Sequence, residues 1–232
     1  MSDTNYYLLV YCAYFAAAVA FAFLLNGVLV KFATTLGTRN ELGIIVRWNS
    51  TSKPALGGIS FFIIFLLSIA SYNIFFANSS VLLNKQLLGL LAACTMAFLM
   101  GLADDAYNTK PLLKLSIQIL CGMILIYAGI FIKLFSYDPL NYFVTIIWVV
   151  GVMNSINMLD NMDSISTLVS IYILASAIIM RYLQNDFHGV YFLILVGTVA
   201  SLCGFLYYNW HPSKLFMGDT GSLAMGGALG AL

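Results

Sequence analysis

Long apolar runs, separated by short polar segments, make up most of the sequence. A membrane-spanning helix needs about 20 mostly apolar residues, and the runs that meet this requirement cover residues 6–33, 57–77, 84–103, 113–132, 141–157, 165–182 and 189–208. An eighth run begins near Ser222 and is still apolar at Leu232. The pattern predicts an all-α, polytopic integral membrane protein with about eight spans in this chain.

The eighth run is too short to cross a bilayer, so we expect the chain to stop partway through a longer protein. No internal repeat, linker or low-complexity tract is visible in the sequence. A single helical domain over residues 1–232, incomplete at its C-terminal end, is therefore the expected organisation.

Composition supports the membrane assignment. Hydrophobic residues make up 62% of the chain and charged residues only 8%, whereas soluble domains contain roughly 25% charged residues. The formal net charge is +1, which provides no electrostatic argument for a nucleic-acid partner.

Basic residues predict the orientation of the spans. The loops and span ends on one side hold Lys31, Arg39, Arg47, Lys53, Lys110, Lys114 and Lys214, and the other side holds Lys85, Lys133 and Arg181. Because Lys and Arg are enriched in cytoplasmic loops, the loops after the odd-numbered spans are predicted to face the cytoplasm.

Acidic residues gather on the same side. At the ends of three different spans lie Asp104, Asp105, Asp160, Asp163 and Asp219. Acidic residues contribute little to topology, so orientation does not explain this bias. A shared site would explain it.

The segment DDAYNTKPLLK, residues 104–114, places charges against helix dipoles. If Pro111 is the first residue of a helix, Asp104 and Asp105 end the preceding helix and Lys114 lies in the first turn of the next one. Both placements are electrostatically unfavourable. They indicate that a ligand or an ion sets the arrangement, whereas simple helix capping does not account for it.

The segment NSINMLDNMDSIS spaces Asn154, Asn157, Asp160 and Asp163 by three residues. This spacing keeps the side chains along one ridge of a helix, and such groups are costly when they face lipid. Hydrogen bonding between helices is one interpretation; the two acids among the asparagines favour a functional site.

Two glycine-containing segments flank the acidic ones. In NWHPSKLFMGDTGSLAMGG, residues 209–227, Asp219 precedes a helix start whose backbone amides suit phosphate, and Asp219 is a candidate ligand of a divalent cation. Gly226 and Gly230 form a GxxxG pattern that predicts helix packing. The segment RWNSTSKPALGG, residues 47–58, is either a positive-inside loop with a Pro-Gly turn or a cationic loop that contacts an anionic ligand.

Taken together, these segments predict magnesium-dependent phosphoryl or glycosyl-phosphate transfer to a membrane lipid. Clustered carboxylates require a cation, and oxygen ligands suit Mg²⁺ bound together with phosphate oxygens. Phosphoryl transfer uses such a metal, a lysine for the diphosphate and an acid near the nucleophile. The alternative is a secondary transporter or cation channel, which predicts acids near the middle of the spans.

Three stretches resemble the signature segments of the polyprenyl-phosphate N-acetylhexosamine-1-phosphate transferases, glycosyltransferase family 4: GLADDAYNTKPLLKLSIQ, NSINMLDNMDS and NWHPSKLFMGDTGSLAMG. The resemblance implies an enzyme of about ten or eleven spans in the bacterial inner membrane that uses Mg²⁺, with Mn²⁺ as an alternative ion. It would transfer a sugar-1-phosphate from a UDP-N-acetylhexosamine to undecaprenyl phosphate at the cytoplasmic face and release UMP, as the first membrane step of cell-envelope polysaccharide synthesis. Whether the protein forms a homodimer is left open.

The resemblance also implies roles for individual residues. The magnesium ligands would be Asp219, Asp105 and Asn157, and the catalytic residues beside the reacting phosphates would be Asp104, Asp105 and Asp163. Direct attack by the lipid phosphate is favoured over attack by an enzyme carboxylate. Substrate-binding residues would be Lys53, Lys114, Asn157, Asp160, Asn209, Phe216 and Gly218.

The sequence departs from the family pattern at two positions, where Asn161 and Ser164 replace frequent glycines. These side chains are expected to narrow or redirect the sugar pocket, or to weaken activity. The family's histidine-rich cytoplasmic loop is expected beyond the eighth span, so this stretch by itself is expected to be inactive. The short segment between Asp105 and Lys114 resembles the branch that uses UDP-N-acetylglucosamine.

Overall fold

The computed structural model describes residues 3–36, 54–76 and 84–232. These residues form eight α-helices and no strand. The helices are α1 (Asp3–Leu36), α2 (Gly57–Phe76), α3 (Lys85–Tyr107), α4 (Pro111–Ala128), α5 (Asp138–Leu159), α6 (Ile165–Leu183), α7 (Val190–Asn209) and α8 (Gly218–Ala231).

The predicted all-α, polytopic class is confirmed. Among the described residues, seven helices, α1 to α7, are long and apolar enough to cross a membrane. The eighth element differs from the prediction: α8 begins at Gly218, before Ser222, and has 14 residues. That length is below what a spanning helix needs, and most of α8 is buried by the helices around it.

The ends of several other helices also differ from the predicted spans. Helix α3, predicted to end at residue 103, continues to Tyr107, so Asp104 and Asp105 lie in its last turn. The run predicted over 113–132 stops being helical at Ala128, because Gly129 adopts a left-handed conformation with φ 88° and its N–H caps the last turn. The run predicted over 141–157 is helical over the longer range Asp138–Leu159. Hydropathy therefore located each helix, whereas the end of α4 is set by its capping glycine.

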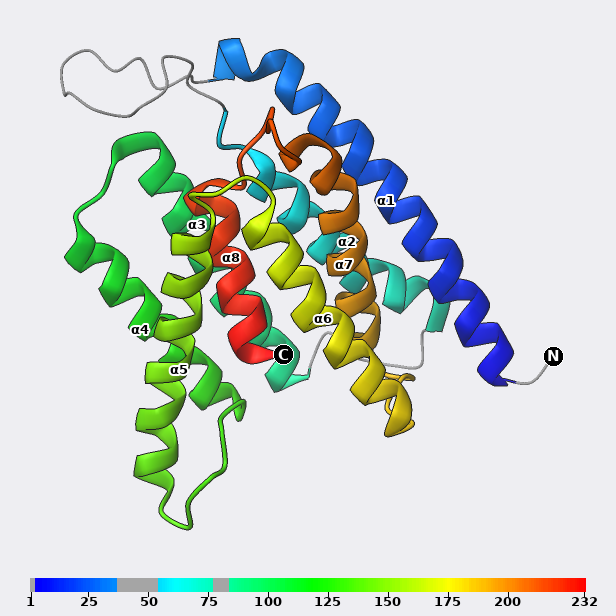
Figure 1. Cartoon of the computed structure of the whole chain (residues 1–232). Coiled ribbons are helices and arrows are strands. Elements are labelled where there is room, and N and C mark those ends of the chain that lie inside the picture. Colours follow the sequence, from blue (N-terminus) through cyan, green and yellow to red (C-terminus); the bar gives the residue numbers. More distant parts are fainter. Residues whose placement is uncertain (1–2, 37–53, 77–83) are drawn as a thin grey trace.

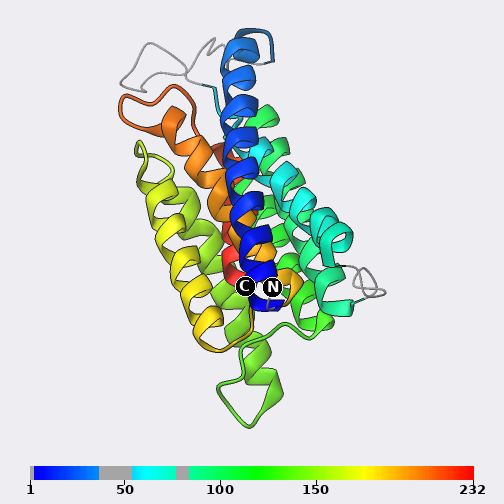
Figure 2. The same ribbon diagram turned by 90° about the vertical axis from the view of Figure 1, so that its right-hand side faces the viewer.

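Helices α7 and α8 lie in the middle of the bundle (Figure 1). Helix α8 packs against α2, α3 and α5, and α7 packs against α1, α2 and α6. Helices α1 and α4 lie at opposite edges, and the view in Figure 2 has α1 in front of the bundle. The connections α3–α4, α5–α6 and α7–α8 are at one end of the molecule, whereas the start of α1 and the end of α8 lie toward the other.

Glycines allow α2 and α3 to approach the start of α8 closely. A Cβ atom at Gly58 would lie 2.2 Å from the backbone nitrogen of Gly221, and one at Gly101 would lie 2.2 Å from the carbonyl oxygen of Asp219. Gly101 is one helical turn before the acidic end of α3. The close contact therefore brings that acidic end onto the first turn of α8.

The predicted role of the GxxxG pattern in helix packing is confirmed. A Cβ atom at Gly226 would lie 2.5 Å from the Cα of Met153, and one at Gly230 would lie 3.4 Å from the Cα of Val149. Both neighbours belong to α5, so the two glycines let α8 pack directly on the helix that carries the asparagine-rich segment.

Backbone hydrogen bonds fix the segment before α8 against the start of α2. The N–H of Phe216 donates to the carbonyl of Pro54 at 2.9 Å. The N–H groups of Gly57 and Gly58 donate to the carbonyls of Phe216 and Met217 at 3.1 and 3.0 Å. Two segments far apart in the sequence thus lie side by side at the end of the bundle.

Candidate active site

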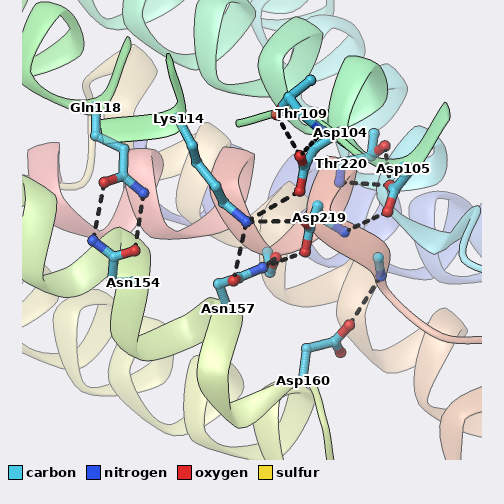
Figure 3. Close-up of polar contacts among 12 residues, drawn as sticks. Asp104, Asp105, Thr109, Lys114, Gln118, Asn154, Asn157, Asp160, Asp219 and Thr220 are labelled. Atoms are coloured by element: carbon cyan, nitrogen blue, oxygen red, sulfur yellow. Dashed lines mark hydrogen bonds and ion pairs between the residues drawn. The ribbon is translucent and has the colours of Figure 1, made fainter. Parts of the chain in front are cut away.

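The ammonium group of Lys114 on α4 lies among three oxygen atoms from three other helices (Figure 3). Its Nζ is 2.9 Å from Asp219 Oδ2, 3.2 Å from Asn157 Oδ1 and 3.4 Å from Asp104 Oδ2. The side chains of Lys114, Asp104 and Asp219 are 18%, 12% and 28% exposed, so water screens their attraction less than at an open surface. We call these four residues the Lys114 cluster.

The local sequence explains why Lys114 reaches this position. Helix α4 begins at Pro111 after the N-cap residue Lys110, as predicted, and the N–H groups of Leu113 and Lys114 donate to the carbonyl of Lys110. Lys114 therefore lies in the first turn, where a positive charge opposes the helix dipole. The carboxylates around it offset this unfavourable placement.

Asp104 also shapes the turn between α3 and α4. Its Oδ1 accepts a hydrogen bond from the backbone N–H of Thr109 at 2.8 Å and another from the Thr109 hydroxyl. Asn108 adopts a left-handed conformation with φ 52° and donates its N–H to the carbonyl of Asp104. One carboxylate oxygen of Asp104 thus holds the turn, while the other faces Lys114.

Asp105 and Asp160 accept the hydrogen bonds at the start of α8. Asp105 accepts from the N–H groups of Asp219 and Thr220 at 3.0 and 2.8 Å and from the Thr220 hydroxyl at 2.6 Å. Asp160 accepts from the N–H of Gly218 at 2.9 Å. Two carboxylates of the protein thus occupy this anion-favouring helix end. That amides at the start of α8 bind phosphate stays a prediction.

Asp160 lies in the connection between α5 and α6. Burial away from water, together with the negative charges of Asp219 and Asp105, raises the pKa of its carboxyl group to about 7. Hydrogen bonds from the Ser166 hydroxyl, at 2.9 Å, and from Gly218 act in the opposite direction. Its predicted contact with the substrate is not tested by this geometry and stays a prediction.

Asn157 connects α5 with α8. Its Nδ2 donates to Asp219 Oδ1 and, at 2.8 Å, to the hydroxyl of Ser222, while its Oδ1 accepts from Lys114. These partners define which atom of the amide is the nitrogen. Asn157 therefore links two charged members of the Lys114 cluster and fixes the position of the Asp219 carboxylate.

Asp163 organises the loop between α7 and α8. It accepts hydrogen bonds from the N–H and hydroxyl of Ser213 at 3.1 and 2.6 Å, and its Oδ2 is 3.0 Å from Nδ1 of His211. These contacts connect the α5–α6 loop to the loop that leads into α8. The predicted position of Asp163 beside the reacting phosphates stays a prediction.

Asn209 is fully buried, and its amide is used inside the protein. Its Oδ1 accepts from the Ser164 N–H at 3.1 Å and the Thr167 hydroxyl at 2.8 Å, and its Nδ2 donates to the Leu215 carbonyl at 3.1 Å. These contacts hold α6, α7 and the following loop together. The predicted contact of Asn209 with uridine stays a prediction.

Ser164, which replaces a family glycine, adopts a left-handed conformation with φ 67°. Glycine tolerates this conformation better than other residues. Here the serine hydroxyl donates to the carbonyl of Asn209 at 3.0 Å and is buried. Its side chain is therefore directed into the protein. Asn161, the other replacement, is exposed and donates to the Met158 carbonyl at 3.0 Å.

The remaining predicted substrate residues flank the start of α8. Gly218 is buried with φ 76°, and a Cβ there would lie 2.6 Å from the Ala55 carbonyl oxygen and 2.8 Å from Asp105 Oδ2. Phe216 lies in the segment that pairs with α2. Lys53 lies outside the described residues. Direct contact of any of these three residues with a substrate stays a prediction.

The oxygen atoms around Lys114 are of the type that a hard divalent cation prefers. Two carboxylates and one amide oxygen converge on the point where the ammonium lies. Within residues 3–36, 54–76 and 84–232, no group of three or more His, Cys, Asp or Glu side chains is arranged to hold a metal ion. A cation here would need further ligands from water or substrate, which is usual for Mg²⁺.

Three hydroxyl residues that the sequence analysis did not single out hold the site residues. Thr109 contacts Asp104, Thr220 contacts Asp105, and Ser222 contacts Asn157. In the sequence, only their position in the polar segments near the aspartates could have pointed to these three residues. Position alone does not identify partners on other helices, because such contacts depend on how the helices are rotated.

A sequence comparison identifies the family. The profile described as glycosyl transferase family 4 matches residues 87–232. The chain belongs to this family. The matched residues cover α3 to α8, apart from the first two residues of α3. They include all four residues of the Lys114 cluster. The family predicted from the three signature segments is thus confirmed, and with seven candidate spanning helices the protein is a multi-pass membrane protein.

Curated relatives of this family 4 chain have names of two kinds. A Bacillus subtilis (strain 168) protein named probable undecaprenyl-phosphate N-acetylglucosaminyl 1-phosphate transferase is 29% identical over 188 residues, which are 77% of this chain and 50% of the relative. A phospho-N-acetylmuramoyl-pentapeptide-transferase from Streptococcus pneumoniae serotype 19F (strain G54) is 30% identical over 196 residues, which are 77% of this chain and 58% of the relative. The matched part thus spans 50–58% of the length of these relatives.

Proposed function

We propose that this protein transfers a sugar-1-phosphate from a UDP-N-acetylhexosamine to undecaprenyl phosphate and releases UMP. An oxygen of the lipid phosphate attacks the phosphorus atom that carries the sugar, and the bond from that phosphorus to the bridging oxygen of UMP breaks. The name of the Bacillus subtilis relative supports both the lipid acceptor and an N-acetylglucosaminyl phosphate donor. The two kinds of relative differ in their sugar, so the proposal names the N-acetylhexosamine class.

The observation that carries the proposal is the Lys114 cluster at one end of the bundle. Four helices bring two carboxylates, an amide and an ammonium group together there. Such a position suits a reaction between a lipid phosphate in the bilayer and a soluble nucleotide. The excess of Lys and Arg on this side supports a location at the cytoplasmic face of the bacterial inner membrane.

Each member of the cluster has a role in the proposal. Lys114 binds the diphosphate oxygens of the donor, and Asp104 orients the lipid phosphate. Asp219 and Asn157 would hold Mg²⁺, or Mn²⁺ in its place, and the ion would neutralise the charge that develops on the phosphate oxygens. The sequence analysis named Asp105 as the third ligand; because both oxygens of Asp105 accept hydrogen bonds from α8, the proposal gives this place to Asp104. Asp105 positions Asp219 by accepting its backbone N–H.

Direct attack by the lipid phosphate needs no enzyme nucleophile. A phosphate monoester has its second pKa at about 6 and is therefore largely a dianion near neutral pH. The protein's task is then to align the two phosphates and to stabilise the charge that develops between them. The transporter or channel alternative requires acids near the middle of the spans, and the position of the cluster at helix ends supports the enzyme instead.

The proposal is tested by measuring UMP release. The full gene product, purified in detergent, is incubated with undecaprenyl phosphate, Mg²⁺ and either UDP-N-acetylglucosamine or UDP-N-acetylmuramoyl-pentapeptide. We expect UMP and a lipid-linked sugar phosphate in equal amounts with one of the two donors. If neither donor supports UMP release above a protein-free control, the proposed function is wrong.

Asp219→Asn tests the assignment of the central carboxylate. We expect kcat to fall by about 100-fold or more, because the variant loses a negatively charged ligand of the cation that would stabilise the developing phosphate charge. Asp186→Asn is the matched control, since Asp186 pairs with Arg181 at the far end of α6; it should leave kcat unchanged. Wild-type turnover in Asp219→Asn would contradict the assignment.

A further inference from the structure

Gln118 and Asn154 form two reciprocal hydrogen bonds between α4 and α5 (Figure 3). Gln118 Nε2 donates to Asn154 Oδ1 at 3.2 Å, and Asn154 Nδ2 donates to Gln118 Oε1 at 2.9 Å. Asn154 Nδ2 also donates to the carbonyl of Val150 at 2.9 Å. That third contact identifies the asparagine nitrogen and so fixes the direction of both amides. We call these two residues the amide pair.

The amide pair lies within two apolar helices. Gln118 is only 1% exposed, and an amide left without a partner in such surroundings is costly. Each side chain satisfies the other only when α4 and α5 adopt one rotation and one register. The pair therefore selects a particular arrangement of the two helices, as polar contacts between membrane helices can do.

The amide pair lies one helical turn from two members of the Lys114 cluster. Gln118 is four residues after Lys114 on α4, and Asn154 is three residues before Asn157 on α5. Residues at these spacings lie on the same face of a helix. The contact of 3.2 Å between Lys114 and Asn157 and the amide pair are thus two successive connections between the same two helices.

Helix α4 needs such a connection because it lies at the edge of the bundle (Figure 1). Leu112, Leu113 and Leu115 in its first turns are all exposed large apolar residues. Its packed face includes the small residues Cys121 and Gly122, which lie against α3 and α5. Apolar packing is not directional, so it constrains the rotation of α4 less than a pair of hydrogen bonds does.

We propose that the amide pair is a positioning element that sets α4 on α5 so that the Lys114 ammonium meets Asn157 and Asp219. The proposal rests on the proposed function, since its purpose is to align a phosphate-binding lysine. Neither amide contacts the cluster's carboxylates in the described contacts of Gln118 and Asn154. The amide pair would therefore affect the reaction only by positioning the Lys114 side chain.

A residue swap tests the proposal in the full gene product. Gln118→Asn shortens the connection by one methylene group, and Asn154→Gln lengthens it by one. We expect each single variant to lower kcat for UMP release by about tenfold or more, because a misplacement of about 1 Å is costly in catalysis. The double variant restores the total length and should recover kcat to within about threefold of wild type.

A second variant separates positioning from folding. Gln118→Met combined with Asn154→Leu replaces both amides by apolar groups of similar shape, which is close to neutral for stability. Spin labels at the exposed positions Leu113 and Met158 then report the distance between the two helices. We expect an unchanged thermal midpoint, a broader distance distribution and a loss of kcat. Ser116→Ala, at an exposed position of α4, is the control and should change none of these.

Two results would overturn the proposal: a double swap no more active than the worse single variant, or an apolar variant with the narrow distance distribution and kcat of wild type. Failure of the proposed function is a separate result. If the wild-type protein releases no UMP with either donor, the spin-label distances still decide whether the amide pair positions α4.

Discussion

At the scale of single residues, Lys114 is the group that allows two carboxylates to lie together. Asp104 and Asp219 carry like charges, and their repulsion is relieved by a cation between them. The Lys114 ammonium lies 3.4 and 2.9 Å from their oxygens. In our proposal a divalent cation shares these oxygens and leaves Lys114 to bind substrate phosphate.

Lys114→Met removes this positive charge and keeps an unbranched side chain. Without divalent cations we expect the variant to lose about 2 kcal/mol of stability, because two partly buried carboxylates lose their counter-ion. Adding Mg²⁺ should raise the thermal midpoint more in the variant than in wild type, since no ammonium competes for the oxygens. Lys110→Met, at an exposed N-cap without a side-chain hydrogen bond, is the control. Equal Mg²⁺ effects in wild type and Lys114→Met would contradict the shared position.

Asp160 predicts a dependence of stability on pH. Its pKa is about 7 in the folded protein, compared with about 3.9 in an unfolded chain. Below about pH 4 the carboxyl group is protonated in both states, and its contribution to stability is fully present. As the pH rises toward 7, the unfolded chain releases its proton first, so stability falls, by up to about 4 kcal/mol.

Asp160→Asn is the variant that isolates this effect. The amide still accepts from Gly218 and meets Ser166, but it does not titrate. Thermal midpoints measured for wild type and variant between pH 4.5 and 7.5 should therefore diverge as the pH rises, with wild type losing more. Parallel curves across this range would show that burial does not perturb Asp160.

At the scale of elements, the first turn of α8 is where the site is assembled. Asp105 from α3 and Asp160 from the α5–α6 connection accept its N–H groups. The start of α2 is hydrogen-bonded to the segment immediately before α8. Two carboxylates at a helix N-terminus are stabilised by the dipole, so the same contacts that hold α8 also orient Asp219.

Gly101→Ala tests the close approach of α3 to α8. The new methyl group would lie 2.2 Å from the backbone carbonyl oxygen of Asp219, so the helices must separate. We expect a loss of about 1–3 kcal/mol in stability and a marked loss of UMP release. Gly151→Ala on α5 is the matched control, because a Cβ there meets no atom within 4 Å; it should be neutral or stabilising by up to about 1 kcal/mol. Similar behaviour of both variants would contradict the packing argument.

At the scale of the whole molecule, the helix directions place the Lys114 cluster at one end of the bundle. The end with the Lys114 cluster contains the start of α4 and the end of α3, whereas the other end contains the connection between α4 and α5. In the proposed orientation the cluster faces the cytoplasm, where a nucleotide sugar is available.

Cysteine labelling in intact bacteria tests this orientation. In a cysteine-free background, Tyr137→Cys, at an exposed position before α5, should react with a membrane-impermeant maleimide from outside. Lys110→Cys, at the exposed start of α4, should react only after the cells are permeabilised. The reverse pattern would place the cluster on the outer side.

The sequence alone determined the helical class, the location of the spans, the family and the gathering of carboxylates at one end. The physical reason is that a bilayer requires helices of a certain length and apolar content, and both can be read along the chain. The same reasoning placed Lys114 correctly, because Pro111 starts α4.

The tertiary structure decided which of these polar groups meet. Asp104 and Asp105 are neighbours in the sequence, yet one faces Lys114 and the other caps α8. Asn209 is a buried structural link although its segment resembles a substrate-binding one. Such outcomes depend on how each helix is rotated, and that rotation is set by close glycine contacts and by hydrogen bonds between residues far apart in the chain.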